Sequence, residues 1–150
     1  MIETKIKIEE IVTDEVLAYR EKNWRRKLPD SFKNFMKNNN GGIPDKKIMI
    51  LDKWEIEKFL CIVPKISESK NGQFDISAVI TKYDEFMVLN GDTLGYDLIP
   101  FAQLNHDSLL CLCYIEKEPS IVVWQLEGSK QFQPNYIKAY DSFDDFLKAF

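Results

Sequence analysis

The sequence predicts an α+β fold in which helices pack against an antiparallel β-sheet of about five or six strands. Three observations support this prediction. Four segments carry hydrophobic residues at helical spacing, β-prone runs lie between them, and the runs in the second half are joined by links too short for parallel crossovers. The length suits one domain with its own core, so residues 1–150 are expected to form a single domain.

The first helix is predicted to begin at Thr13, whose side chain can cap it and which precedes two acidic residues. Residues 3–12 before it fit either an edge strand or a helix. The inner face of the first helix is expected to hold Val16, Tyr19 and Trp24.

A second helix is predicted after Pro29, because proline suits a first helical turn. Phe32, Phe35 and Met36 share one side of it. Asn40-Gly41-Gly42 ends this helix, since glycine tolerates the left-handed conformation that closes a helix.

Short β-prone runs at residues 47–51 and 58–63 precede a polar loop at residues 67–73. Asp75 is predicted to cap a third helix that ends at Asn90-Gly91. Its apolar positions are Ile76, Val79, Ile80, Tyr83 and Met87.

The last part of the chain predicts four strands and a closing helix. Residues 109–115 are apolar on both faces, which favours a central strand covered on each side. Ser142 is placed to cap the final helix, with Asp145 at the acidic position of a capping box. The other predicted strands are residues 98–102, 121–126 and 136–140, and the final helical stripe is Phe143, Phe146, Leu147 and Phe150.

The negative charge is concentrated in one segment. The chain carries 20 basic and 24 acidic residues, for a net charge of −4, yet no Lys or Arg lies between Tyr83 and Glu116. That segment has six carboxylates, and the rest of the chain is slightly basic. It is either a solvated face or an acidic surface that attracts a basic protein. The candidate partner-binding residues are Asp84, Glu85, Asp92, Asp97 and Asp107.

Trp54 is a further candidate for partner binding. It follows Asp52-Lys53 in the predicted turn between residues 47–51 and 58–63. We expect an aromatic side chain there to be more exposed than average, and exposed tryptophans often anchor protein partners.

No residue pattern supports catalysis, so the chain is predicted not to be an enzyme and to need no cofactor. His106 is the only histidine, and neither a Gly-x-Ser-x-Gly elbow nor a glycine-rich phosphate loop is present. No metal site is expected, because Cys61, Cys111 and Cys113 lie in apolar runs where cysteine behaves as a small hydrophobe.

The acidic balance argues against direct binding of nucleic acid. The one candidate for nucleic-acid binding is the basic run at residues 20–27, in which Trp24 could stack on a base. The run also fits a solvated helix end, where cations suit the helix dipole, and we favour that interpretation. With no signal sequence, no membrane-spanning run and an odd number of cysteines, the expected compartment is the cytoplasm and no membrane partner is expected.

Three short motifs occur in order along nearly the whole chain. They are Leu-Pro-Asp-Ser-Phe at residues 28–32 leading to Asn40-Gly41-Gly42, Ile-Pro-Phe-Ala at residues 99–102, and Ser-Phe-Asp-Asp-Phe-Leu at residues 142–147. With these motifs the chain resembles the SUKH superfamily, which includes fungal cell-wall assembly regulators and bacterial toxin-immunity proteins. It departs from the family at residues 105–108, Asn-His-Asp-Ser, where members often carry glycines.

The resemblance implies a SUKH-like fold and a non-enzymatic, protein-binding function. A small member is similar to immunity proteins that block a cognate polymorphic toxin, often a nuclease. An acidic surface suits that role, because a nuclease presents a basic cleft to its own substrate. The alternative is a regulatory or scaffold module that binds several proteins and is not tied to a toxin.

Overall fold

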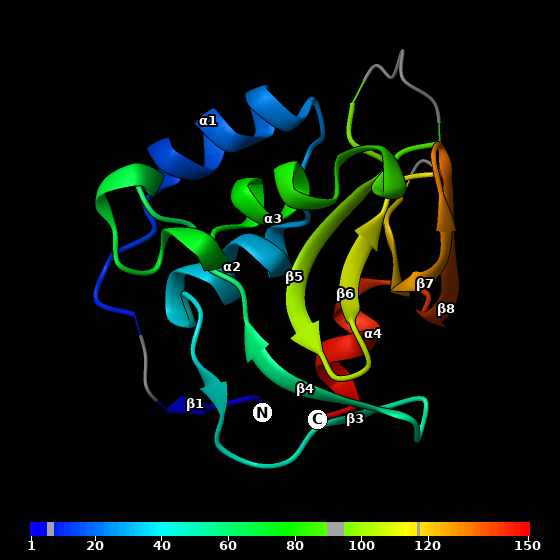
Figure 1. Ribbon diagram of the computed structural model, residues 1–150. Coiled ribbons are helices and arrows are strands. Elements are labelled where there is room, and N and C mark those ends of the chain that lie inside the picture. The colour runs from blue at the N-terminus through cyan, green and yellow to red at the C-terminus, as the bar shows by residue number, and fades with distance from the viewer. Residues whose placement is uncertain (6–7, 90–94, 117) are drawn as a thin grey trace.

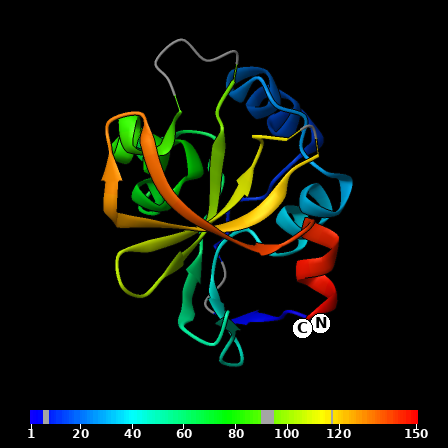
Figure 2. The same cartoon turned by 90° about the vertical axis from the view of Figure 1, so that its right-hand side faces the viewer.

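The centre of the fold is a six-stranded antiparallel sheet with the order β3-β4-β5-β6-β7-β8. The computed structural model describes residues 1–5, 8–89, 95–116 and 118–150. The sheet is strongly curled, like half of a barrel (Figures 1 and 2). Its strands are β3 (Met49–Ile50), β4 (Trp54–Phe59), β5 (Leu98–Leu104), β6 (Ser108–Cys113), β7 (Ser120–Lys130) and β8 (Gln133–Tyr140).

Helices cover this sheet, so the predicted α+β class is confirmed. The helices are α1 (Asp14–Trp24), α2 (Asp30–Asn38), α3 (Ile76–Tyr83) and α4 (Phe143–Lys148). A small second sheet pairs β1 (Thr4–Lys5) with β2 (Ile43–Pro44). Short 3₁₀ turns complete the chain: η1 (Ile66–Glu68), η2 (Gly72–Phe74) and η3 (Asp84–Met87).

Strand β6 lies inside the sheet and all six of its residues are buried, as predicted for a central strand. Aromatic contacts show what covers the sheet. Phe143 of α4 lies 5.4 Å from Phe101 of β5, between ring centroids, and Tyr83 of α3 lies 4.8 Å from Trp124 of β7. The aromatic residues predicted for the helix faces therefore supply much of the core.

The three predicted helix caps are confirmed. Thr13, Asp75 and Ser142 each accept a hydrogen bond from a backbone N–H in the first turn of α1, α3 and α4. The predicted inner face of α1 is partly wrong, because Tyr19 is 63% exposed and Arg20 is buried instead. The third helix is shorter than predicted: it ends at Tyr83, since Asp84 turns to a φ of 39°. Its predicted end at Asn90-Gly91 lies outside the described residues.

Arg20 and Asp75 form a buried, bidentate ion pair between α1 and the start of α3. Arg20 Nη1 and Nη2 each donate to one Asp75 oxygen at 2.8 Å, and Nη2 also donates to the Val63 carbonyl oxygen at 2.9 Å. Asp75 accepts from the backbone N–H groups of Val63 and Ser77, both at 2.8 Å. Each charge of this buried pair is therefore compensated by the other and by further hydrogen bonds.

Asn40 does more than mark the end of α2. Its side chain is buried and bonds both backbone groups of Ile62: Oδ1 accepts from the N–H at 2.8 Å, and Nδ2 donates to the carbonyl oxygen at 3.0 Å. Gly41 follows with a φ of 79°, and a Cβ there would lie 2.5 Å from Ile8 Cδ1. The motif therefore attaches the end of α2 to the segment after β4, and glycine is needed for both conformation and space.

The two ends of the chain lie side by side (Figures 1 and 2). The Met1 amino group donates a hydrogen bond to the carbonyl oxygen of Phe150. This places the end of α4 next to the segment that leads into β1.

Candidate protein-binding surface

A groove of about 600 Å³ runs between α3 and the turn that joins β5 to β6. Buried Val79 and Leu109 provide apolar lining. The exposed side chains of Glu57, His106 and Asp107 also line it, together with Lys82 and Tyr83 of α3. The groove therefore combines apolar lining with charged side chains, as sites for protein or small-ligand binding commonly do.

The β5–β6 turn is held firmly by the strands on both sides. On one side Asn105 N donates to the Glu55 carbonyl oxygen at 3.2 Å, and Asn105 Oδ1 accepts from Glu55 N at 3.0 Å. On the other side Leu126 N donates to the Asp107 carbonyl oxygen at 3.1 Å. His106 and Asp107 occupy the tip of the loop between the paired residues Leu104 and Ser108, with φ values of 59° and 50°. Their side chains are thus presented on a rigid support.

The predicted acidic residues separate into different environments. Asp107 lies at the groove, and Asp84 is exposed directly after Tyr83, which also lines the groove. Glu85 is half-buried, and its carbonyl oxygen accepts a hydrogen bond from Phe132 N at 2.9 Å. Asp92 lies outside the described residues.

Asp97 is not part of an open acidic surface, contrary to expectation. It is buried, its Oδ1 lies 3.4 Å from Arg26 Nη2, and its Oδ2 accepts from Leu89 N at 3.0 Å. Its negative charge is already compensated inside the protein by Arg26. The sequence could not reveal this pairing, because the two residues are distant in the chain.

Trp54 is also buried, so the expectation that it is exposed is wrong. It begins β4 rather than sitting in a turn, and only 4% of its surface is accessible. Residues of β4 alternate between the two faces of the sheet, and Trp54 shares its inward face with Ile56. The Lys53 ammonium lies 4.6 Å from the centroid of the Trp54 ring.

Glu57 is a groove residue that the charge count missed, because it lies outside residues 83–116. The same alternation that buries Trp54 and Ile56 turns Glu57 outward. A strand prediction that began at Trp54 instead of residue 58 would have identified it.

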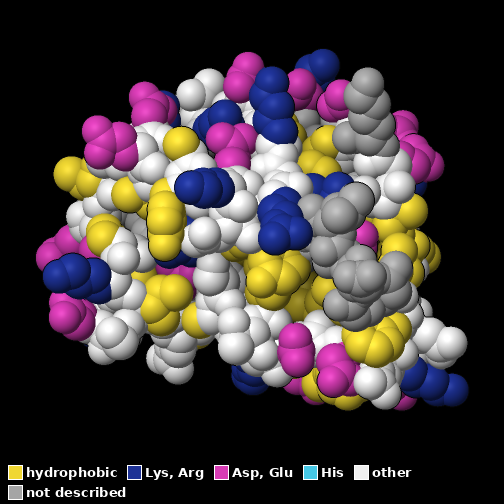
Figure 3. All heavy atoms as spheres, turned by 90° about the horizontal axis from the view of Figure 1, so that it is seen from above, with side chains coloured by type: hydrophobic (Ala, Val, Ile, Leu, Met, Phe, Trp, Pro, Cys, Tyr) yellow, Lys and Arg dark blue, Asp and Glu magenta, His cyan; other side chains and the backbone are white. Residues whose placement is uncertain are grey.

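Charge of one sign does not dominate the face seen in Figure 3. Lys and Arg side chains there are interspersed with Asp and Glu side chains around α1 and α3. The acidic residues therefore act as local groups rather than as one continuous acidic surface on this face.

Two of the five basic residues in the run at residues 20–27 are engaged within the fold, while Lys22, Arg25 and Lys27 are exposed. Arg20 is paired with Asp75, and Arg26 Nε donates to the Tyr96 carbonyl oxygen at 2.9 Å. Trp24 is buried, and its Nε1 donates to Ser77 Oγ at 3.0 Å. The alternative in which Trp24 stacks on a nucleic-acid base is therefore wrong.

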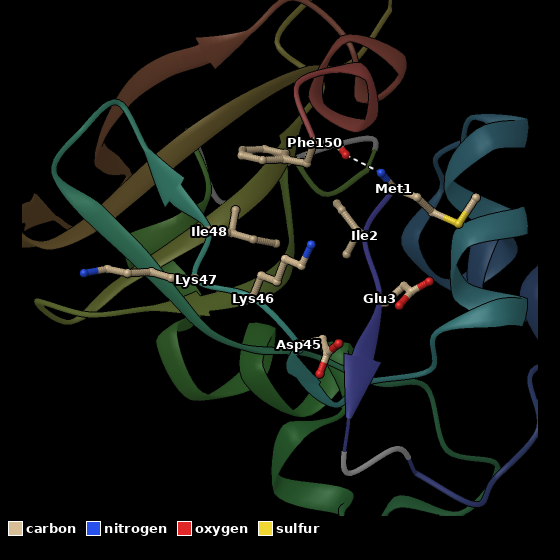
Figure 4. Close-up of a pocket in the computed structure, with 8 residues that line it drawn as sticks. All are labelled: Met1, Ile2, Glu3, Asp45, Lys46, Lys47, Ile48 and Phe150. Atoms are coloured by element: carbon tan, nitrogen blue, oxygen red, sulfur yellow. Dashed lines mark hydrogen bonds between the residues drawn. The ribbon is translucent and has the colours of Figure 1, made fainter.

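A second cavity, of about 350 Å³, lies where the chain ends meet (Figure 4). Ile2, Ile48 and Phe150 contribute apolar surface, and the side chain of Lys47 is turned away from the cavity. None of the predicted site residues lines it. We therefore take the groove as the candidate site.

The three cysteines are buried and unbridged. Across the part of the chain that the structure describes, no three His, Cys, Asp or Glu residues are grouped to hold a metal ion. Burial, with a smaller contribution from Asp75, raises the pKa of the Cys61 thiol from 9.0 to about 12. Burial also raises the pKa of Cys111 and of Cys113.

The raised pKa of Cys61 predicts a loss of stability in alkali. Above pH 9.0 the thiol ionises in the unfolded chain while it stays protonated in the folded chain up to about pH 12. The unfolded state then binds fewer protons, so the free energy of unfolding falls as pH rises through this window and is unaffected by this thiol below it. Urea unfolding at neutral pH and at about pH 10 measures the fall. Cys61→Ala should show a smaller fall, and an equal fall in this variant would contradict the assignment to Cys61.

The fold and its groove define a class: an α+β domain with a rigid hairpin turn beside a mixed apolar and charged groove. The sequence model of the SMI1 / KNR4 family (SUKH-1) matches residues 11–149. The chain therefore belongs to the SMI1 / KNR4 family, as the motifs predicted. A search of curated proteins gave no match.

Family membership agrees with an immunity or regulatory role, carried out through protein binding and, in general, without catalysis. No helix within the described ranges is both long enough and apolar enough to cross a membrane.

Proposed function

We propose that the protein is an immunity protein that binds a cognate, nuclease-type toxin in the cytoplasm and blocks it without covalent chemistry. The observation that carries the proposal is the groove, which Asp107 and Glu57 line together with apolar side chains, and Asp84 follows directly on the lining residue Tyr83. Glu85 and Asp92, which follow Asp84 in the sequence, complete the proposed acidic contact. Asp97 and Trp54 are buried and are left out of this surface.

The physical argument concerns charge and shape together. A nuclease must present cationic groups to phosphates, and carboxylates placed opposite those groups speed association and exclude partners of the wrong charge. The half-buried rings of Phe74 and Tyr83, which also line the groove, can then bury partner surface, which supplies affinity that charge alone does not.

Co-expression tests the proposed function directly. A candidate nuclease-type toxin domain is expressed in a sensitive host with and without this protein. Rescue of growth, together with a one-to-one complex of the purified proteins, supports the proposal. Binding to other host proteins without rescue would favour the regulatory alternative.

Reversing the charge of the exposed acids is expected to slow toxin association. In the Asp84→Lys/Asp107→Lys variant the association rate should fall by about tenfold or more at low salt, and its dependence on salt should weaken. Stopped-flow fluorescence over a salt series gives both quantities.

Asp45→Lys/Asp52→Lys is the control with the same change in net charge, because both residues are exposed and neither lines the groove. Lysine is less suited than aspartate to the positive φ of Asp84 and Asp107. Asp84→Asn/Asp107→Asn therefore provides a conservative second variant, with a smaller expected effect. Equal slowing by the Asp45→Lys/Asp52→Lys variant would show that only net charge matters.

A further inference from the structure

The tip of the β5–β6 turn carries side chains where glycine would fit with less strain. His106 and Asp107 both have positive φ, a conformation that costs free energy for residues with a Cβ. Both side chains are exposed and make no hydrogen bond or ion pair with other described residues. The turn therefore leaves both side chains open to solvent and available to a ligand in the groove.

The charged side chains of Glu57, Asp107 and Lys82 line the groove beside this turn, together with His106. Glu57 and Asp107 contribute carboxylates, and Gln103 Nε2 donates to Glu57 Oε1 at 3.4 Å. Lys82 is the one basic side chain among the lining residues, and its ammonium lies 5.3 Å from the centroid of the Tyr83 ring. The volume of about 600 Å³ is within the range of ligand pockets and exceeds the needs of one side chain.

We propose that this groove receives a single arginine or lysine side chain on a protruding segment of the partner, bound by the carboxylates of Asp107 and Glu57. The aliphatic stem of that side chain packs against the half-buried rings of Phe74 and Tyr83, as long cationic side chains do. This inference rests on the proposed function for one point, that the partner is a protein. The new claim is that the β5–β6 turn selects the partner, and that the total acidic charge does not.

The β3–β4 turn provides a control. Leu51 and Asp52 lie in it with φ values of 52° and 54°, so Asp52, like Asp107, is an exposed aspartate with a positive φ in a hairpin turn. Asp52 does not line the groove. Asp52→Gly and Asp107→Gly therefore remove the same charge and relieve the same strain, and they should shift the melting temperature by similar small amounts.

The test is a titration with capped tripeptides followed by ¹H–¹⁵N NMR. The probes are acetyl-Gly-Arg-Gly-amide, its lysine analogue, and the glutamine analogue as the uncharged control. The cationic peptides should shift the amide signals of Tyr83 and of residues 106–109, and the glutamine peptide should not. Affinity should fall by about threefold or more in Asp107→Gly and in Glu57→Gln, and stay unchanged in Asp52→Gly. Lys82→Gln should bind the cationic peptides more tightly, because it removes the opposing charge.

Three results would overturn the inference: no shift with either cationic peptide, equal shifts with the glutamine peptide, or equal loss of affinity in Asp52→Gly. These outcomes are distinct from failure of the proposed function. If the protein binds the cationic peptides in the groove but does not rescue growth, the role of the groove is supported and the proposed toxin partner is contradicted.

Discussion

Replacing Asp75 by asparagine is expected to lower the free energy of unfolding by about 3–5 kcal/mol, because it leaves Arg20 as a buried charge without its counter-ion. The substitution preserves size, but it puts an amide N–H₂ among groups that all donate. In the native protein the two Asp75 oxygens accept hydrogen bonds from Arg20, Val63 N and Ser77 N. Asparagine has only one side-chain oxygen to accept them. Denaturant unfolding at neutral pH measures the change from the midpoint at constant m-value.

Asp141→Asn is the control for this experiment. Asp141 lies 2.6 Å from Lys138 Nζ in an exposed pair, so its loss should lower the free energy of unfolding far less than the loss of Asp75 does. Similar losses at Asp141 and Asp75 would show that the buried network contributes no more than a surface ion pair.

Replacing Asn40 by alanine is expected to cost about 2–4 kcal/mol. The reason is that the N–H and the carbonyl oxygen of Ile62 each lose the Asn40 partner in a buried environment, where an unpaired polar group pays its full desolvation penalty. The Glu10 carbonyl oxygen, which also accepts from Asn40 Nδ2 at 2.9 Å, loses that bond as well. The same denaturant experiment measures the effect.

Asn38→Ala removes the same atoms two residues earlier, from an exposed position at the end of α2. It should change stability by less than about 0.5 kcal/mol. If both alanine variants unfolded at the same denaturant concentration, the bonds to Ile62 would not be the reason why asparagine occupies position 40.

Local patterns were sufficient to predict most of the fold. Thr13, Asp75 and Ser142 cap their helices through interactions with the next three residues, so their roles can be read from short segments. The apolar pattern of residues 109–115 likewise predicted a central strand, and β6 is that strand. Strand β4 was predicted to begin at residue 58, but it begins four residues earlier, at Trp54. Trp54 was therefore assigned to a turn and not to the inward face of a strand.

The candidate site was harder to predict, because it depends on contacts between distant segments. Asp97 and Asp107 look equivalent in a charge count, but the fold puts Arg26 next to Asp97 and leaves Asp107 open to the groove. In the sequence Arg20 looks like part of a basic surface. In the fold it is paired with Asp75, which lies 55 residues later in the chain. Glu57 comes from another strand altogether. Sequence identified carboxylates as candidate residues, and tertiary structure decides which of them a partner can reach.

The meeting of the two chain ends has a consequence for anything attached to them. In Figure 2 both ends lie at the lower right, whereas α3 and the β5–β6 turn lie on the left. A tag, a label or an additional domain therefore leaves the protein from one and the same side, whichever end carries it. The groove on the opposite side stays accessible, so the protein can be anchored through either end in a similar orientation toward its partner.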